Sequence, residues 1–311
     1  MTSRLPMKSV DLTVRLAGLR LKNPVIAASG TYGYGTEYQR LAPASDFGAI
    51  ITKTVTLAPR AGNPPPRLCE TPSGMLNAIG LANVGIDAFL RDKLPPLRRA
   101  GTVVIANIAG NTVAEYVQLA RRLDEAPGIA AIEVNISCPN VKHGGVAFGI
   151  DPRVAAALTR SVKKATKLPV IVKLSPNVSD IAAVAWAVAR AGADALSLIN
   201  TLYGMAIDIK RRRPALGNVT GGLSGPAIRP VALYHVYKVC QAVDLPVIGL
   251  GGISTAEDAV AFLLAGARAV QVGTATFVDP GAARAISAGL ARYCREHGFR
   301  KVSDISGALQ Q

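Results

Sequence analysis

Cysteine and histidine are scarce in this chain of 311 residues. The four cysteines, Cys69, Cys138, Cys240 and Cys294, are far apart, and the three histidines are equally scattered. No two cysteines have the CxxC spacing that is typical of zinc and iron–sulfur sites. The sequence therefore argues against a metal or cluster held by this chain alone. We expect reduced thiols, any of which could act as a nucleophile or a base.

Long apolar runs are also missing. No run approaches the roughly 18 residues that a membrane-spanning helix needs. No apolar segment follows Arg4 and Lys8, as it would in a signal peptide. Half of the residues are nevertheless hydrophobic and only 18% are charged, which provides a large core and excludes global disorder. We expect a cytoplasmic protein that does not bind a membrane.

Acidic residues are few relative to basic ones. The chain has 35 lysines and arginines against 20 aspartates and glutamates, which gives a formal net charge of +15. Such a surplus is typical of proteins that bind nucleic acid, anionic substrates or an acidic partner. The net charge alone does not select among these three.

Eight short apolar runs recur along the chain, each followed by a turn rich in Gly, Asn, Ser or Thr. They are continuous runs of Val, Ile, Ala and Leu, which is typical of strands buried on both faces of a parallel sheet. The predicted strands are residues 24–29, 49–55, 103–108, 131–137, 169–174, 195–199, 246–250 and 269–272.

Helical patterns separate these strands. The predicted helices are residues 85–99, 112–125, 151–167, 180–191, 226–243 and 255–265. Ser254 and Glu257 have the spacing of a capping box at the start of the last one. Eight strands alternating with helices predict an α/β fold of the (β/α)8 TIM barrel type, with a doubly wound sheet as the alternative.

Nothing in the sequence reads as a linker, so we expect residues 1–311 to form a single domain. Alternating polar and apolar residues around Gly18 predict an N-terminal hairpin over residues 11–21. Two segments, 56–80 and 201–225, are long for barrel loops and are predicted to be insertions.

Polar residues gather at the predicted strand ends, where TIM barrels carry their chemistry. Three asparagines, two lysines and a cysteine converge there, together with two glycine-rich turns. These ends carry Ser29, Lys53, Thr54, Asn107, Asn135, Cys138, Lys173, Asn200, Thr201, Gly251, Gly252, Gly273 and Thr274.

The glycine-rich turns GLGG (249–252) and VGT (272–274) follow the seventh and eighth strands. Loops at these two places often hold a phosphate with backbone N–H groups. Tight turns alone are the simpler interpretation, but the occurrence of both loops in register favours a phosphate site. A phosphorylated cofactor such as FMN would suit it.

Lys173 lies in the apolar strand VIVKL, where an unpaired lysine would be costly to bury. It either forms a salt bridge at the rim or places a cation beside the pyrimidine edge of a flavin. The predicted phosphate site favours the second interpretation, and Lys53 is interpreted in the same way.

Asparagine side chains carry both a donor and an acceptor, so several on one rim suit an amide or a pyrimidine ring. The candidates are Asn77, Asn107, Asn135, Asn140 and Asn200.

Cys138 precedes Pro139 and a loop with three glycines, Lys142 and His143. A buried structural cysteine is the usual case, but positive charge near a thiol favours the reactive thiolate.

Four segments together resemble dihydroorotate dehydrogenase: TKTVTLAPRAGNPPPRLCETPSGMLNAIGL (52–81), NISCPNVKHGG (135–145), VIVKLSPN (170–177) and IGLGGI (248–253). The resemblance covers essentially the whole chain. It is closest to class 1B, the NAD-linked type, in which an FMN barrel pairs with a second subunit that carries FAD and a 2Fe-2S cluster. It implies a heterotetramer around a homodimer core, acting in pyrimidine biosynthesis.

The resemblance also implies roles for individual residues. Cys138 would be the catalytic base. The residues expected to bind dihydroorotate or orotate are Lys53, Asn77, Ala78, Ile79, Gly80, Leu81, Asn135, Asn140, Asn200 and Thr201. The residues expected to bind FMN are Ser29, Lys53, Thr54, Asn107, Asn135, Lys173, Ile199, Gly225, Gly251, Gly252, Gly273 and Thr274. The sequence NVG at 83–85 departs from the common Asn-Pro-Gly of the family.

Other interpretations remain open on the sequence. A class 1A enzyme would use fumarate without a second subunit. A tRNA dihydrouridine synthase is also an FMN barrel with a Cys-Pro pair, but no C-terminal helical domain for gripping RNA follows the barrel, so we expect no nucleic-acid partner. A non-catalytic flavin-binding barrel would leave Cys138 and the asparagines incidental. The basic run at 210–213 is either a solvated face or a docking patch for an acidic electron-transfer subunit.

Overall fold

The computed structural model describes residues 10–137 and 148–310. Its centre is a closed barrel of parallel strands in which each strand pairs with the next one along the chain, and β16 pairs with β3 to close the ring. The barrel strands are β3 (Val25–Ala27), β4 (Ala49–Ile51), β7 (Val103–Ile108), β8 (Ala131–Asn135), β9 (Val170–Lys173), β10 (Ala195–Leu198), β15 (Val247–Leu250) and β16 (Ala269–Val272). The predicted TIM barrel and its eight strands are confirmed.

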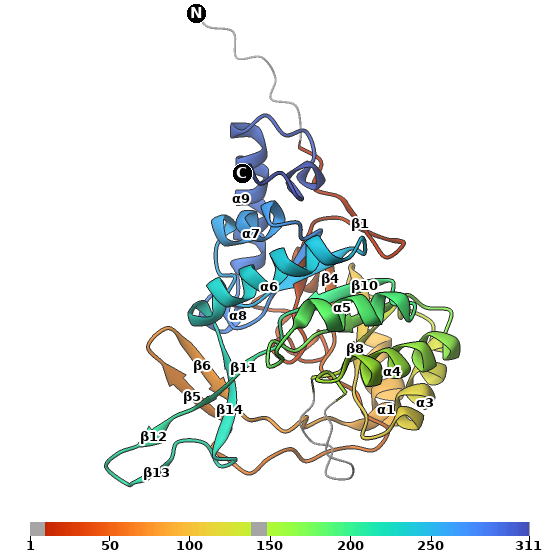
Figure 1. Cartoon of the computed structure of the whole chain (residues 1–311), viewed down its shortest axis with the longest axis vertical. Helices are drawn as coiled ribbons and strands as arrows, with labels where there is room; N and C mark the ends of the chain where they lie inside the picture. Colours follow the sequence, from red (N-terminus) through yellow and green to blue (C-terminus); the bar gives the residue numbers. More distant parts are fainter. Residues whose placement is uncertain (1–9, 138–147, 311) are drawn as a thin grey trace, which may run out of the picture.

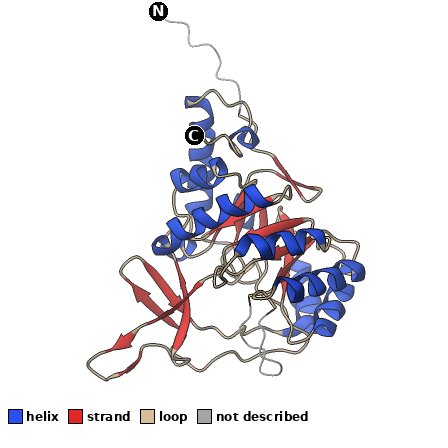
Figure 2. Cartoon of the chain, viewed as in Figure 1, coloured by secondary structure: helices blue, strands red, loops and turns tan. Residues whose placement is uncertain are grey.

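Helices surround the barrel on the outside (Figure 2). The long ones are α3 (Val113–Asp124), α4 (Pro152–Ala165), α5 (Ile181–Arg190), α6 (Arg229–Ala242), α7 (Ala256–Leu264) and α9 (Ala282–Glu296). Short turns accompany them: η1 (Ala44–Asp46), η3 (Pro226–Ile228), α8 (Ala275–Val278) and η4 (Val302–Ile305). Their apolar sides pack on strands whose residues are almost all buried, so the core lies between the helices and the barrel wall.

Side-chain caps start several of these helices. Thr112, Asp151 and Asp180 each accept a hydrogen bond from a backbone N–H in the first helical turn. The capping box of α7 is formed by Thr255 and Asp258. The predicted pair, Ser254 and Glu257, was therefore wrong by one residue. Both pairs have the same spacing in the sequence, and α7 begins at Ala256, directly after Thr255.

The predicted helix over 85–99 is interrupted. It consists of α1 (Gly85–Ala88), a π-helical turn η2 (Phe89–Lys93) and α2 (Leu94–Leu97). Two prolines, Pro95 and Pro96, lie at the start of α2. Proline has no N–H to donate, so the regular α-helical hydrogen bonds cannot continue through these two residues. The α-helix changes to a π-helical turn just before them.

The two insertions pair with each other. Segment 56–80 contains β5 (Leu68–Thr71) and β6 (Gly74–Asn77), and segment 201–225 contains β11 (Leu202–Met205) and β14 (Thr220–Ser224). They form one sheet in the order β11-β14-β6-β5, which lies beside the barrel (Figure 1).

Two smaller antiparallel pairs are also present among the described residues. The hairpin of β12 (Ile207–Asp208) and β13 (Arg213–Pro214) extends from the four-stranded sheet at the lower left of Figure 1. The predicted N-terminal hairpin is present as β1 (Val14–Leu16) and β2 (Leu19–Leu21). No helix within the described part of the chain is long and apolar enough to cross a membrane.

Candidate functional site

A cavity of about 410 Å³ lies where the barrel strands end and the four-stranded sheet begins. Its wall is made from the C-terminal ends of β3, β4, β8, β9, β10, β15 and β16 on one side and from β6, β11 and β14 on the other. This is the end of a TIM barrel at which binding residues are found. The volume is within the range of cavities that hold a cofactor or a small ligand.

Most of the predicted site residues line this one cavity. Those that do are Ser29, Lys53, Thr54, Asn77, Ala78, Ile79, Gly80, Leu81, Asn135, Lys173, Ile199, Asn200, Thr201, Gly225, Gly251, Gly252, Gly273 and Thr274. Asn107 does not line it: the residue is fully buried behind Thr54, whose hydroxyl donates a 2.6 Å hydrogen bond to Asn107 Oδ1. Cys138 and Asn140 lie outside the described residues.

One part of the wall is bare backbone. Gly251 and Gly252 have φ values of +125° and +77°, which favour glycine. A Cβ atom on Gly252 would lie 2.7 Å from the carbonyl oxygen of Gly225, and one on Gly225 would lie 2.7 Å from the Cα of Gly74. Hydroxyl groups adjoin this backbone, since Thr274 Oγ1 donates to Ser224 Oγ at 2.8 Å. These glycines let separate segments of the chain pack backbone against backbone at the cavity wall.

The opposite part of the wall is rich in amides. Asn77 Nδ2 donates to the carbonyl of Gly222 at 3.2 Å, which fixes it to β14. Asn200 Nδ2 lies 3.4 Å from Asn135 Oδ1, and that oxygen also accepts from the backbone N–H of Ser137 at 3.1 Å. These side chains come from the first insertion and from the ends of two barrel strands, β8 and β10, and together they present donors and acceptors to the cavity.

Positive charge dominates the wall. Lys53 and Lys173 both line the cavity, and no aspartate or glutamate does among the residues that the structure describes. Burial lowers the pKa of Lys53; nearby Glu37 acts in the opposite direction, and Arg67 lowers the pKa further. A pocket with cations and without carboxylates suits an anionic ligand.

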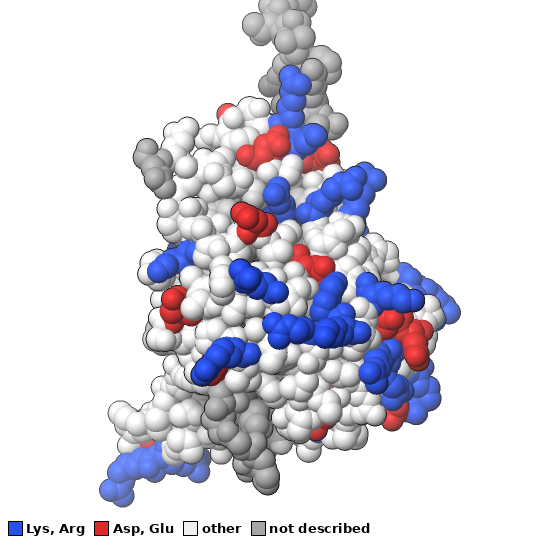
Figure 3. Space-filling model, turned by 45° about the vertical axis from the view of Figure 1, so that its right-hand side comes forward, with Lys and Arg blue, Asp and Glu red and all other residues white. Residues whose placement is uncertain are grey.

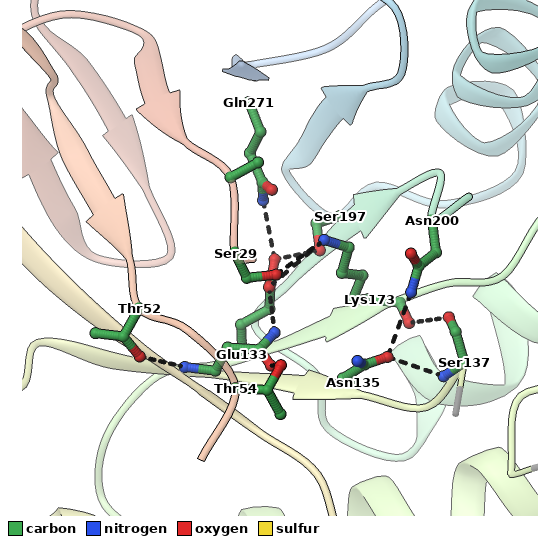
Figure 4. A network of polar contacts seen from close by, with 12 residues as sticks. Ser29, Thr52, Thr54, Glu133, Asn135, Ser137, Lys173, Ser197, Asn200 and Gln271 are labelled. Carbon is green, nitrogen blue, oxygen red and sulfur yellow. Dashed lines mark hydrogen bonds and ion pairs between the residues drawn. The ribbon is translucent and has the colours of Figure 1, made fainter. Parts of the chain in front are cut away.

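Lys173 is almost fully buried, and its Nζ atom lies 3.2 Å from Ser29 Oγ and 4.0 Å from Glu133 Oε2 (Figure 4). The lysine thus has an ion-pair partner and also faces the cavity, so the two sequence-based interpretations do not exclude each other.

The sequence reasoning missed Glu133, which lies in the middle of the apolar run AAIEVN. The signal that singled out Lys173, a charge inside a buried strand, was present there too.

Gln271 was missed as well. Its Nε2 donates to Glu133 Oε1 at 2.9 Å, while its buried Oε1 atom has no partner. The residue lines the cavity from β16. An unpaired buried acceptor at a cavity wall is what a ligand N–H would satisfy.

Figure 3 shows basic side chains spread over one face of the molecule, with a group at the tip of the β12–β13 hairpin. That tip carries the exposed residues Lys210, Arg211, Arg212 and Arg213. In the described ranges 10–137 and 148–310, no group of three or more His, Cys, Asp or Glu residues is placed to hold a metal ion.

The family model and the individual relatives that match this chain point to the same family. Residues 11–293 match the dihydroorotate dehydrogenase family. A relative from Geobacter sulfurreducens, named dihydroorotate dehydrogenase B (NAD(+)), catalytic subunit, is 59% identical over 304 residues, which cover 98% of this chain and 100% of the relative. A relative of the same name from Desulforudis audaxviator is 61% identical over 302 residues, which cover 97% of this chain and 98% of the relative.

These matches extend over nearly the full length of both partners and include the insertions that complete the cavity. They favour the first of the sequence-based interpretations over a dihydrouridine synthase or a non-catalytic barrel. This chain belongs to the dihydroorotate dehydrogenase family.

Proposed function

We propose that this chain oxidises (S)-dihydroorotate to orotate in the de novo synthesis of UMP, as the FMN-containing catalytic subunit of a cytoplasmic, NAD-linked enzyme. The observation that carries this proposal is the single cavity that joins bare glycine backbone to a wall of amides and lysines. The names of the relatives, each called the catalytic subunit of an NAD-linked dihydroorotate dehydrogenase, support the same reading.

The cavity fits FMN in three respects. Gly225, Gly251 and Gly252 line the cavity with main chain alone, which suits a phosphate held by backbone N–H groups. Lys173 offers a buried cation, and Gln271 Oε1 offers an unused acceptor. Bound FMN would supply the acceptor for the hydride that leaves C6 of dihydroorotate. The residues proposed to hold it are Ser29, Lys53, Thr54, Asn135, Lys173, Ile199, Gly225, Gly251, Gly252, Gly273 and Thr274, with Asn107 behind them acting through the hydroxyl of Thr54.

Dihydroorotate is a carboxylate with alternating C=O and N–H groups. Side-chain amides match such a ring because each has a donor and an acceptor. We assign this task to Asn77, Asn135, Asn140, Asn200 and Thr201, with the backbone of residues 78–81 beside them. The Lys53 ammonium, which lines the same cavity, would attract the carboxylate.

Cys138 is proposed to be the base. Its Sγ atom would take the proton from C5 as the hydride leaves C6, and a C5=C6 double bond forms. The residue before it, Ser137, lines the cavity, and its N–H is held by Asn135 Oδ1. The described chain therefore reaches the cavity wall at Ser137, the residue that precedes Cys138 in the sequence.

Electrons then pass to NAD through a second subunit that carries FAD and a 2Fe-2S cluster, in a heterotetramer with a homodimer core. The alternative, a class 1A enzyme, needs no such subunit.

The experiment is steady-state turnover of the purified chain with dihydroorotate and either fumarate or NAD. We expect no turnover with either acceptor until the iron–sulfur subunit of a relative is added, and then turnover with NAD. Turnover on fumarate by the chain alone would contradict the NAD-linked assignment.

A further inference from the structure

Glu133 accepts three side-chain hydrogen bonds beneath the cavity. Its side chain is fully buried on β8 and does not line the cavity itself. Oε2 accepts from Asn107 Nδ2 at 2.6 Å, and Oε1 accepts from Ser197 Oγ at 2.7 Å and from Gln271 Nε2 at 2.9 Å. Lys173 Nζ lies 4.0 Å from Oε2. The carboxylate therefore joins β8 to β7, β9, β10 and β16 (Figure 4).

All of these neighbours are donors or cations, which matches the acceptor-only chemistry of an ionised carboxylate. A buried ion pair is a weak source of stability, because desolvation offsets much of its Coulombic attraction. Well-packed apolar residues would fill the inside of a barrel at least as well. We therefore look for the role of Glu133 in the side chains that it binds.

Those groups reach the cavity wall. Lys173 and Gln271 line the cavity themselves. Asn107, held through its Nδ2, presents Oδ1 to the hydroxyl of Thr54, which lines the cavity too. One buried carboxylate thus orients a cation on β9, an amide on β16 and a hydroxyl in the loop after β4.

We propose that Glu133 is a positioning residue for the flavin, an inference that rests on the proposed function. It fixes Lys173, Gln271 and the Asn107–Thr54 pair in the orientation that FMN meets. Its negative charge also offsets part of the Lys173 charge, so that reduced flavin is stabilised less than it would be by an unopposed lysine.

The test is the reduction potential of FMN bound to the whole chain, measured by titration with a chemical reductant in the absence of dihydroorotate. Glu133→Gln keeps the volume and removes the charge. We expect its potential to rise by at least a tenfold change in the equilibrium between oxidised and reduced flavin, about 30 mV for a two-electron couple. Lys173→Met should shift the potential in the opposite direction, and the double variant should return toward the wild type.

Asp124→Asn is the matched control. Asp124 also accepts three hydrogen bonds, from Thr166 Oγ1 and from the backbone N–H groups of Lys167 and Leu168, but it lies outside the cavity wall. This variant should lose stability while the flavin potential stays at the wild-type value. An unchanged or lowered potential in Glu133→Gln would overturn the proposal.

If Glu133→Gln binds no FMN, Glu133→Asp decides, because it keeps the negative charge that Lys173 and the hydrogen-bond donors meet. The proposal expects Glu133→Asp to retain FMN binding; a Glu133→Asp chain as defective as Glu133→Gln would overturn it. Wild-type chain that binds FMN but is not reduced by dihydroorotate would instead count against the proposed function, since the titration does not use that substrate.

Discussion

The carbonyl oxygen of Gly225 occupies the place where a side chain on Gly252 would begin, since a Cβ there would lie 2.7 Å from it. The same Cβ would lie 3.0 Å from the backbone nitrogen of Arg229. Both neighbours are main-chain atoms, so neither can turn aside as a flexible side chain would. The end of β15 and the end of the second insertion meet through backbone alone at the proposed phosphate site.

Gly252→Ala is therefore expected to weaken FMN binding at least tenfold, because the loop must move to admit the methyl group. The measurement is FMN affinity by quenching of flavin fluorescence. Gly298→Ala is the matched control: its φ of +75° imposes a similar backbone strain of roughly 1–2 kcal/mol, but no atom lies within 4 Å of its Cβ. Equal FMN affinity in the two variants would show that the site does not depend on this close approach.

Cys138→Ala should slow reduction of the flavin by dihydroorotate by about 100- to 10,000-fold, the usual contribution of a general base. In the wild type the rate should rise with pH as the thiol ionises. Cys138→Ser should be impaired less, and its rate should rise only at higher pH, since a hydroxyl is the weaker acid. The measurement is anaerobic stopped-flow absorbance. Near wild-type reduction by Cys138→Ala would refute the base assignment.

Lys53 should make dihydroorotate binding depend on pH. Burial lowers its pKa, so the ammonium loses its proton at a pH below the ordinary value of 10.5. The attraction for the substrate carboxylate is present below the pKa of Lys53 and is lost as pH rises through it. We expect KM for dihydroorotate to increase toward pH 10 in the wild type. In Lys53→Arg it should stay flat, because the guanidinium remains charged. The same rise in both enzymes would exclude Lys53 as its source.

The exposed basic hairpin tip provides a test of partner docking. Lys210→Glu combined with Arg212→Glu should slow NAD reduction in the complex and leave flavin reduction by dihydroorotate unchanged. The control reverses two exposed charges on α4, with Arg160→Glu and Lys164→Glu. If the hairpin and α4 variants reduce NAD equally fast, the hairpin is only a solvated surface.

The barrel was predictable from the sequence because its strands are buried on both faces and stand out as continuous apolar runs. The sheet made by the insertions was not. Its central contact joins β6 to β14, where Asn77 pairs with Gly222, 145 positions farther along the chain. No local sequence pattern in either insertion predicts that these two distant strands pair. The start of α7 shows the same limit on a smaller scale, since Ser254–Glu257 and Thr255–Asp258 have identical spacing.

Most of the predicted site residues line the cavity, because strand ends and resemblance to the family both pointed to them. Gln271 in the cavity wall and Glu133 beneath it were not predicted. Both residues lie within their strands, and their importance comes from partners on other strands. These groups come together only when the barrel closes. The sequence could therefore indicate a charged residue in an apolar run, but it could not identify the hydrogen-bond partners of that residue.

The central claim is that dihydroorotate reduces flavin held in this cavity. The most direct measurement is to load the purified chain with FMN, add dihydroorotate without oxygen, and follow the visible absorbance of the flavin. The account predicts that the absorbance bleaches within one turnover, without any partner subunit. Flavin that binds but stays oxidised when dihydroorotate is added would contradict it.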